Sequence, residues 1–197
     1  MPRFFRYLTH PQVQIDPSVP VPEWGLSEIG RTRAKRFASL AILESTKVIV
    51  SSAETKAIET AKIISSVINV PIEIYEKTHE NDRSATGFLE PKEFESVADS
   101  FFEYPDKSIR GWERAVDVQS RIVDEAAKIF ETYQEGDILM IGHGAVGTLL
   151  YCHFAVLEIS RQYDQPGGGG NMFTVQMNTK SIVHPWASIE RLTAENR

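Results

Sequence analysis

Two histidines occupy comparable positions in this chain of 197 residues. His10 follows a strand-like run at residues 3–8, and His143 follows an apolar run at residues 138–142. In a parallel α/β sheet, ligands bind beyond the carboxyl ends of the strands. Residues that follow two buried strands can therefore share one pocket, although they are far apart in sequence. Two imidazoles in one pocket suit phosphoryl transfer, in which one attacks phosphorus and the other stabilises the charge.

The neighbours of each histidine bear on this chemistry. Pro11 follows His10 and stiffens the turn, and a nucleophilic imidazole must be neutral and fixed in one tautomer. Gly142 and Gly144 flank His143, so the backbone there can pass close to a ligand. A helix predicted to begin just after His143 would offer free backbone N–H groups and a positive dipole end, both of which favour anions.

Strand and helix signals alternate along the chain, which is typical of a mainly parallel sheet covered by helices. We predict an α/β fold, a three-layer α/β/α sandwich, with residues 1–197 forming a single domain. The predicted strands cover residues 3–8, 48–50, 72–75, 137–142, 172–177 and 181–183. The predicted helices carry apolar positions at residues 29–40 and 57–68, cover residues 92–102 and 112–133, and begin again near residue 145.

Two connecting segments are unusual in composition. The segment from 77 to 91 has no predicted element but contains His79, Glu80, Asp82 and Arg83. Four consecutive glycines at residues 167–170 predict a hinge or the approach to a hairpin. They do not form a phosphate loop, because no Lys-Ser/Thr pair follows them.

A further group of residues opens the second predicted helix. Ser52 is followed by Lys56-Ala57 and then by Thr60-Ala61. With the two histidines, this order and spacing resemble the histidine phosphatase superfamily, the phosphoglycerate mutase-like proteins. Members usually carry Arg-His-Gly after the first strand, a Ser four residues before an Arg, and a second His-Gly after a later strand. The run Leu26–Gly30 is also similar to a helix start of that family, so the resemblance covers nearly the whole chain.

The resemblance implies a phosphoglycerate mutase-like fold and a phosphatase activity with no metal or organic cofactor. His10 would accept the phosphoryl group, and water would hydrolyse the phosphohistidine. His143 would stabilise the transition state. Glu80 would protonate the leaving oxygen, with Asp82 as the alternative acid, because the family places its acid in this loop.

The chain also departs from the family pattern. Thr9 and Pro11 flank His10 where Arg and Gly are usual, and Lys56 replaces an Arg. An arginine grips two phosphate oxygens with a planar fork, whereas lysine is a point charge. The candidate phosphate-binding residues are therefore Lys56 with compensating cations, together with Thr9, Ser52 and Gly144. Among the cations Arg83 is the better candidate and Arg110 is a third option. Arg6 cannot simply replace the missing arginine, because it lies four residues before His10, about 13 Å along a strand, but its side chain shares a face with His10 and is expected to reach part of that distance.

The net charge, the apolar stretches and the cysteine content exclude some classes of function and location. The net charge of −6 argues against nonspecific nucleic-acid binding but allows a small phosphorylated substrate or a phosphoprotein. No stretch is apolar enough to predict a membrane span. The single cysteine, Cys152, excludes an intrachain disulfide and favours the cytoplasm; we expect this thiol to be buried. Nothing in the sequence separates a monomer from a homodimer.

Three alternatives remain open at this stage. The first is a catalytically weak or inactive relative that binds phosphate or a phosphorylated partner. The second is a metal site built from His10, His79, His143 and Asp82, although no pair has compact ligand spacing. The third concerns the aromatic residues, which are candidates for a pocket lining but are more common in cores. These are Trp24, Phe88, Trp112 and Trp186.

Overall fold

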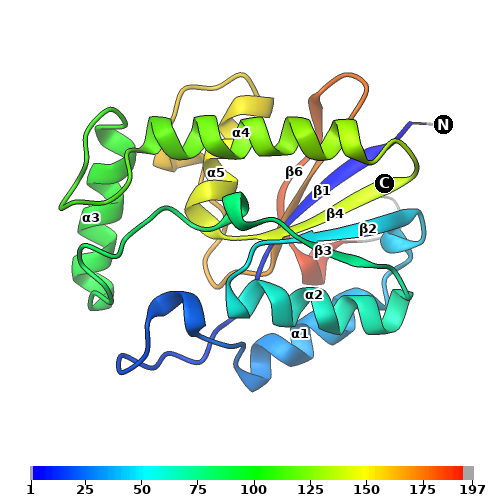
Figure 1. Ribbon diagram of the computed structural model, residues 1–197, viewed down its shortest axis with the longest axis horizontal. Helices are drawn as coiled ribbons and strands as arrows, with labels where there is room; N and C mark the ends of the chain where they lie inside the picture. The colour runs from blue at the N-terminus through cyan, green and yellow to red at the C-terminus, as the bar shows by residue number, and fades with distance from the viewer. Residues whose placement is uncertain (1, 193–197) are drawn as a thin grey trace.

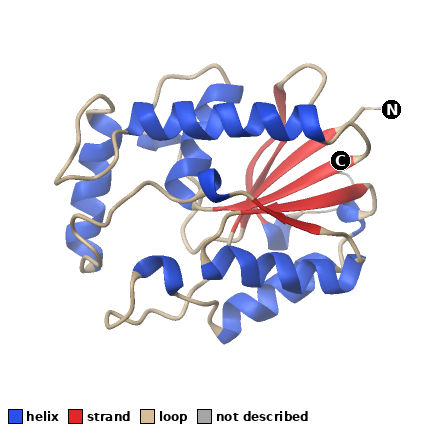
Figure 2. Cartoon of the chain, viewed as in Figure 1, coloured by secondary structure: helices blue, strands red, loops and turns tan. Residues whose placement is uncertain are grey.

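The centre of the molecule is a six-stranded sheet with helices on both faces (Figures 1 and 2). The computed structural model describes residues 2–192. The strands are β1 (Phe4–Thr9), β2 (Thr46–Ser51), β3 (Ile72–Ile74), β4 (Asp137–Gly142), β5 (Asn171–Gln176) and β6 (Ser181–Ser188). They lie in the order β3-β2-β4-β1-β5-β6. The first four pair in parallel and the last two antiparallel, which confirms the predicted mainly parallel sheet.

Two apolar clusters show which helices cover each face. Helices α1 (Glu28–Ala38) and α2 (Thr55–Ile68) pack on one side, against Leu8 of β1. Helices α3 (Pro91–Glu103), α4 (Ala115–Thr132) and α5 (Gly144–Phe154) pack on the other, against Phe5 and Tyr7. Because successive residues of a strand face opposite sides of the sheet, the apolar side chains of β1 contribute to both clusters. The result is the expected three-layer α/β/α sandwich.

Local chemistry explains most of the helix boundaries. Ser27 accepts a hydrogen bond from the Gly30 N–H (3.1 Å) and caps α1. Asn69 ends α2 in the left-handed conformation (φ 55°). Helix α4 begins at Ala115, later than the predicted residue 112, because Arg110 and Gly111 both take positive φ in a preceding turn.

The last strand is longer than predicted. β6 extends to Ser188 because it pairs along the full length of β5, from Asn171 opposite Ser188 to Gln176 opposite Ser181. It contains Pro185, which an edge strand tolerates because one of its sides needs no ladder hydrogen bonds.

The register of the sheet brings the predicted site together. Thr9 at the end of β1 lies opposite Gly142 at the end of β4, and the His10 N–H donates to the Gly142 carbonyl (3.0 Å). On the other side of β4, the Ser52 N–H donates to the Ile141 carbonyl (3.2 Å). The chain therefore leaves three adjacent parallel strands at one edge of the sheet, at residues 10, 52 and 143.

The structure also bears on the predictions for the cysteine and for a membrane span. Cys152 is a free, buried cysteine, and burial raises the pKa of its thiol. Within residues 2–192, no helix is both long enough and apolar enough to cross a membrane.

Candidate active site

The His10 ring is held in one tautomer by the residue that follows it. Its Nδ1 lies 2.8 Å from the Pro11 carbonyl oxygen. Because a carbonyl oxygen can only accept, Nδ1 carries the proton and Nε2 keeps its lone pair. Burial lowers the pKa of His10 to about 4, so the ring is neutral at pH 7. These are the two properties that a nucleophilic imidazole requires.

The His143 ring stands beside that of His10. The ring centroids are 5.2 Å apart and the planes are inclined at 66°. His143 Nε2 is hydrogen-bonded to Ser52 Oγ at 2.6 Å. Ser52, the residue directly after β2, therefore fixes the orientation of this second ring. Burial lowers the pKa of His143 to about 3, against the opposing effect of the Glu54 carboxylate. Both rings are therefore neutral at pH 7.

Glu54 is a site residue that the sequence analysis missed. One of its oxygens lies 3.4 Å from His143 Nε2, and the other accepts from the Lys56 ammonium at 2.5 Å. Burial would raise the pKa of Glu54, but His143, Lys56 and hydrogen bonds lower it to about 2. Lys56 also donates to the Val21 carbonyl (2.8 Å). The cation in the place of the family's arginine is thus already paired with an internal anion.

Glu80 occupies the N-terminus of α5. Its carboxylate accepts hydrogen bonds from the backbone N–H of Ala145 (3.2 Å) and of Val146 (2.9 Å). The Glu80 N–H in turn donates to Glu54 (2.9 Å), which ties the middle loop to the site. The expectation that this helix end offers free N–H groups to a ligand is therefore wrong for these two amides. The helix dipole instead holds the carboxylate of the candidate acid.

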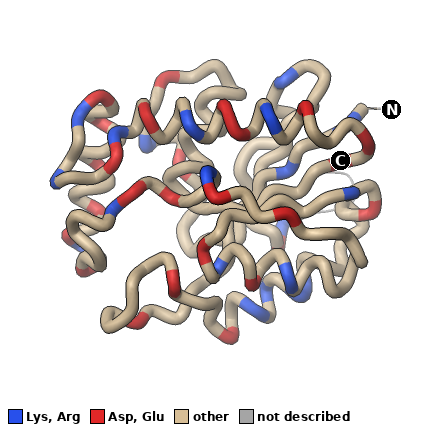
Figure 3. The backbone as a smooth tube through the Cα atoms, viewed as in Figure 1, with Lys and Arg blue, Asp and Glu red and all other residues tan. Residues whose placement is uncertain are grey.

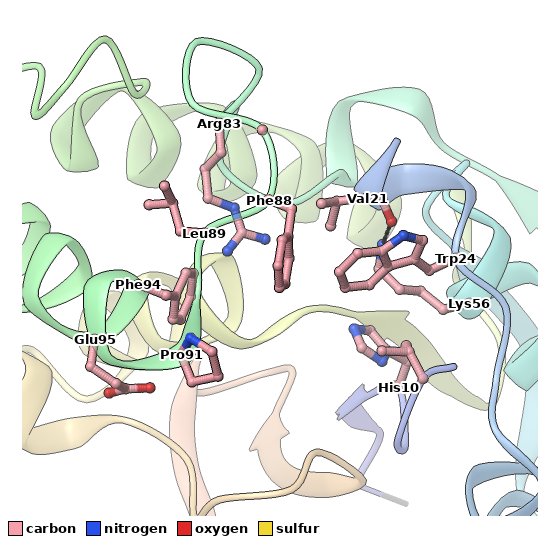
Figure 4. A pocket seen from close by; sticks show the side chains of 12 residues that line it. His10, Val21, Trp24, Lys56, Arg83, Phe88, Leu89, Pro91, Phe94 and Glu95 are labelled. Atoms are coloured by element: carbon pink, nitrogen blue, oxygen red, sulfur yellow. Dashed lines mark hydrogen bonds between the residues drawn. The ribbon is translucent and has the colours of Figure 1, made fainter. Parts of the chain in front are cut away.

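Two adjoining cavities connect these residues. One, of about 280 Å³, is lined by His10, Lys56 and Arg83 among others (Figure 4). The other, of about 550 Å³, is lined by Glu54, Glu80 and Arg83. Val21 and Gly87 also belong to both linings. The candidate nucleophile and the candidate acid thus line two neighbouring cavities that share three lining residues.

Arg83 is the better placed of the proposed compensating cations. Its guanidinium lies over the ring of Phe94 (5.2 Å) and that of Trp112 (5.5 Å), and Figure 4 shows it pointing into the cavity. No carboxylate among residues 2–192 forms an ion pair with it. Elsewhere, basic and acidic residues are interspersed, as along α4 in Figure 3.

Arg6 is placed away from the site, which corrects the prediction that it compensates for a lost arginine. It is 2% exposed and forms an ion pair with Asp137 at 2.7 Å. Asp137 begins β4, whereas His143 follows the end of that strand. Six residues of strand separate the two by roughly 20 Å. Arg6 therefore balances a buried carboxylate at the opposite edge of the sheet.

Thr9 and Gly144, which were predicted to bind phosphate, contact other residues of the protein. The Thr9 hydroxyl donates to Gln165 Oε1 (2.6 Å) and accepts from the Asn171 N–H (3.0 Å). A Cβ on Gly144 would lie 2.7 Å from Gln165 Nε2, so this glycine makes room for that side chain. Gln165 thus packs behind the site, and nothing in its sequence context indicated this.

The alternative acid and the third cation are both engaged elsewhere. Asp82 is exposed, and its carboxylate accepts from the Ser84 N–H (2.8 Å), which lowers its pKa. Glu80 is the better placed of the two carboxylates, because it is bonded to the start of α5 directly after His143, whereas Asp82 is bonded within its own exposed loop. Arg110 forms an exposed ion pair with Glu93.

The metal alternative finds no support in the arrangement of ligands. Among residues 2–192 no group of three or more His, Cys, Asp or Glu side chains is arranged to hold a metal ion. The predicted aromatic candidates divide into two sets. Trp24 and Phe88 line the smaller cavity, whereas Trp112 and Trp186 pack with core residues.

The glycine-rich segment lies directly against the candidate nucleophile. The Gly170 N–H donates to the His10 carbonyl (3.1 Å). Gly169 has φ +63°, and a Cβ there would lie 2.4 Å from the same oxygen. Gly169 and Gly170, the last two of the four glycines, therefore let the chain pack closely against the His10 backbone, and the segment leads into the β5–β6 hairpin, which is one of the two predicted roles.

The structure thus brings a neutral, tautomer-fixed histidine beside a second histidine at the carboxyl edge of an α/β sheet, which is the arrangement that the sequence predicted. The sequence matches the family described as the histidine phosphatase superfamily (branch 1) over residues 14–182. The chain belongs to this family. The matched range begins just after His10, in keeping with the unusual residues around it. Among curated proteins, none matches the sequence significantly.

Solved structures with the same fold are similar over nearly the full length of both chains. A mycobacterial glucosyl-3-phosphoglycerate phosphatase is 19% identical with a TM-score of 0.75, covering 95% of this chain and 97% of that one. Bacillus stearothermophilus YhfR is 19% identical with a TM-score of 0.76, covering 92% and 95%. A putative α-ribazole-5′-P phosphatase from Escherichia coli is 15% identical with a TM-score of 0.74, covering 94% and 96%.

Proposed function

We propose that this protein is a phosphomonoesterase that works through a phosphohistidine on His10. The observation that carries the proposal is the His10 ring itself, which is neutral and has its Nδ1 proton held by the Pro11 carbonyl. Its free Nε2 belongs to a residue that lines a cavity. The expected substrate is a small phosphate monoester or a phosphoprotein. We place the reaction in the cytoplasm and expect it to need no metal.

The proposed reaction has two steps. His10 Nε2 attacks phosphorus while the ester P–O bond breaks, and Glu80 gives a proton to the leaving oxygen. Water then attacks the phosphohistidine, Glu80 takes a proton from it, and the P–N bond breaks to release inorganic phosphate. His143 stabilises the charge on the phosphoryl oxygens in both transition states. Lys56 and Arg83 supply the positive charge that the family usually obtains from arginines.

A second function, phosphate binding without turnover, is favoured by one specific contact. The Lys56 ammonium is paired with Glu54 inside the pocket, so part of its charge is not available to a phosphate. In this version the pocket would bind phosphate or a phosphorylated partner weakly, and the two histidines would not complete the reaction.

A single-turnover experiment separates the two functions. The protein is mixed with an activated aryl phosphate, and the reaction is quenched in base to trap acid-labile, base-stable phosphate. A burst of product with covalent label is expected for the wild type. The His10→Asn variant, whose amide can still donate to Pro11, should give neither. His153→Asn, at an exposed residue of α5, serves as the control and should label normally. A folded wild type that binds phosphate but gives no label would favour the binding function.

A further inference from the structure

The smaller cavity extends from His10 to Arg83 between two segments of the chain. One is the loop after β1, which contributes Val21 and Trp24, and the other leads into α3 (Figure 4). Because His10 lies at one end, the cavity is where the alcohol part of a bound phosphate monoester would lie.

Most of the lining is apolar. The apolar members include Val13, Val21, Trp24, Phe88, Leu89 and Phe94. The rings of Trp24 and Phe88 are 5.7 Å apart and inclined at 56°. The indole N–H of Trp24 is already bonded to the carbonyls of Asp16 (2.8 Å) and Val19 (3.1 Å). These two aromatic side chains therefore offer a ligand only ring surface.

The polar side chains of the cavity are few and mostly engaged. Lys56 donates to Val21 and Glu54. Glu95 forms an ion pair with Arg161. The Arg83 guanidinium stacks on the Phe94 ring, so this cation already has an aromatic partner in the cavity wall. A sugar or sugar acid would lose hydrogen bonds to water here and find few replacements, which is costly.

We propose that this cavity binds an aromatic alcohol, so that the substrates are phosphate monoesters of aromatic alcohols in preference to phosphorylated sugars or sugar acids. The proposal rests on the proposed phosphatase function. The size agrees with it: a cavity of about 150 Å³ holds benzene, and the 280 Å³ available here leaves room for a second ring. Phe88 and Trp24 form the ring-binding wall.

The test compares two esters whose alcohols are similarly poor leaving groups. These are 2-naphthylmethyl phosphate and glycerol 2-phosphate, so that their difference reports on binding of the alcohol part. We expect kcat/KM to be at least tenfold higher for the naphthylmethyl ester. The Phe88→Ala variant should lower that ratio about tenfold. Tyr104→Ala, at an exposed aromatic residue outside the cavity, is the control and should leave the ratio unchanged.

A binding measurement separates this proposal from the proposed catalysis. Dissociation constants are measured for 2-naphthylmethylphosphonate and for methylphosphonate, neither of which can be hydrolysed. Tighter binding of the naphthyl compound, lost in Phe88→Ala, supports the aromatic cavity even if neither ester turns over. Equal binding of the two phosphonates, or equal weakening of both by Phe88→Ala, would overturn it. Turnover of both esters with equal kcat/KM would overturn the substrate preference and leave the phosphatase function intact.

Discussion

Replacing Glu54 with glutamine should strengthen phosphate binding. The Glu54 carboxylate lies 2.5 Å from the Lys56 ammonium, so a phosphoryl group held by Lys56 would lie roughly 5 Å from it. At that distance and an effective dielectric of about 20, two unit negative charges repel by about 3 kcal/mol. The substitution removes this repulsion and frees the Lys56 charge. Allowing for partial solvent screening, we expect the affinity for inorganic phosphate to rise at least tenfold.

The assay is isothermal titration calorimetry with inorganic phosphate at pH 7.5 and low salt. The variant should be less stable, because Lys56 loses a buried partner, and phosphate should restore more of its Tm than in the wild type. Glu59→Gln provides the control: Glu59 is on the same helix and pairs with Arg31 (2.8 Å), but it lines neither cavity.

Unchanged or weaker phosphate binding in Glu54→Gln would refute the reasoning. Glu54 would then act mainly by holding His143 and Lys56 in position, and the ligand would lie elsewhere. A similar gain in Glu59→Gln would point to a general charge effect and would equally count against the local repulsion.

Three further predictions follow from the geometry. Glu80→Gln should slow an alkyl phosphate more than an activated aryl phosphate in steady-state assays, since only the first needs a proton donor; equal slowing would argue against Glu80 as the acid. Gly169→Ala should lower kcat by displacing His10 and destabilise the fold by about 1–3 kcal/mol, whereas Gly167→Ala, with no atom within 4 Å of the added Cβ, should change neither. The third concerns pH. The pKa of His10 is about 4 in the fold and 6.5 as its ordinary value, so the unfolded chain binds more protons between these limits. The contribution of His10 to the free energy of unfolding should therefore be complete above pH 6.5. It should fall by roughly 2–3 kcal/mol as the pH drops to 4. Urea unfolding at several pH values should show a shallower fall in His10→Asn, and an equal fall would show that His10 is not buried as a neutral ring.

The strand ends that carry the two histidines could be predicted from the sequence because both strands are short, apolar and followed by turn residues. The side-chain pairing could not. Arg6 was expected to reach toward His10, but its partner Asp137 is 131 residues away. A local pattern contains no signal for such a contact. The strong attraction between two buried opposite charges decides where the guanidinium lies.

The missed residue Glu54 did have a signal. It lies between Ser52 and Lys56 in the same run, where it precedes the first turn of α2. A carboxylate two residues before a lysine is close enough to neutralise it, as Glu54 does with Lys56. Gln165 had none, because its contact with the site depends on how the loop before β5 folds back over α5.

The position of β1 in the sheet has a consequence for how the protein is assembled. β1 lies between β4 and β5, so both of its hydrogen-bonded neighbours come from residues 137–176. During synthesis both edges of β1 remain unpaired until residues 137–176 have been made. Closing so long a loop is slow, since its entropy is lost before the contacts form. The candidate nucleophile therefore reaches its working environment only after residues 137–176 have been made, so a chain that still lacks them has no complete site.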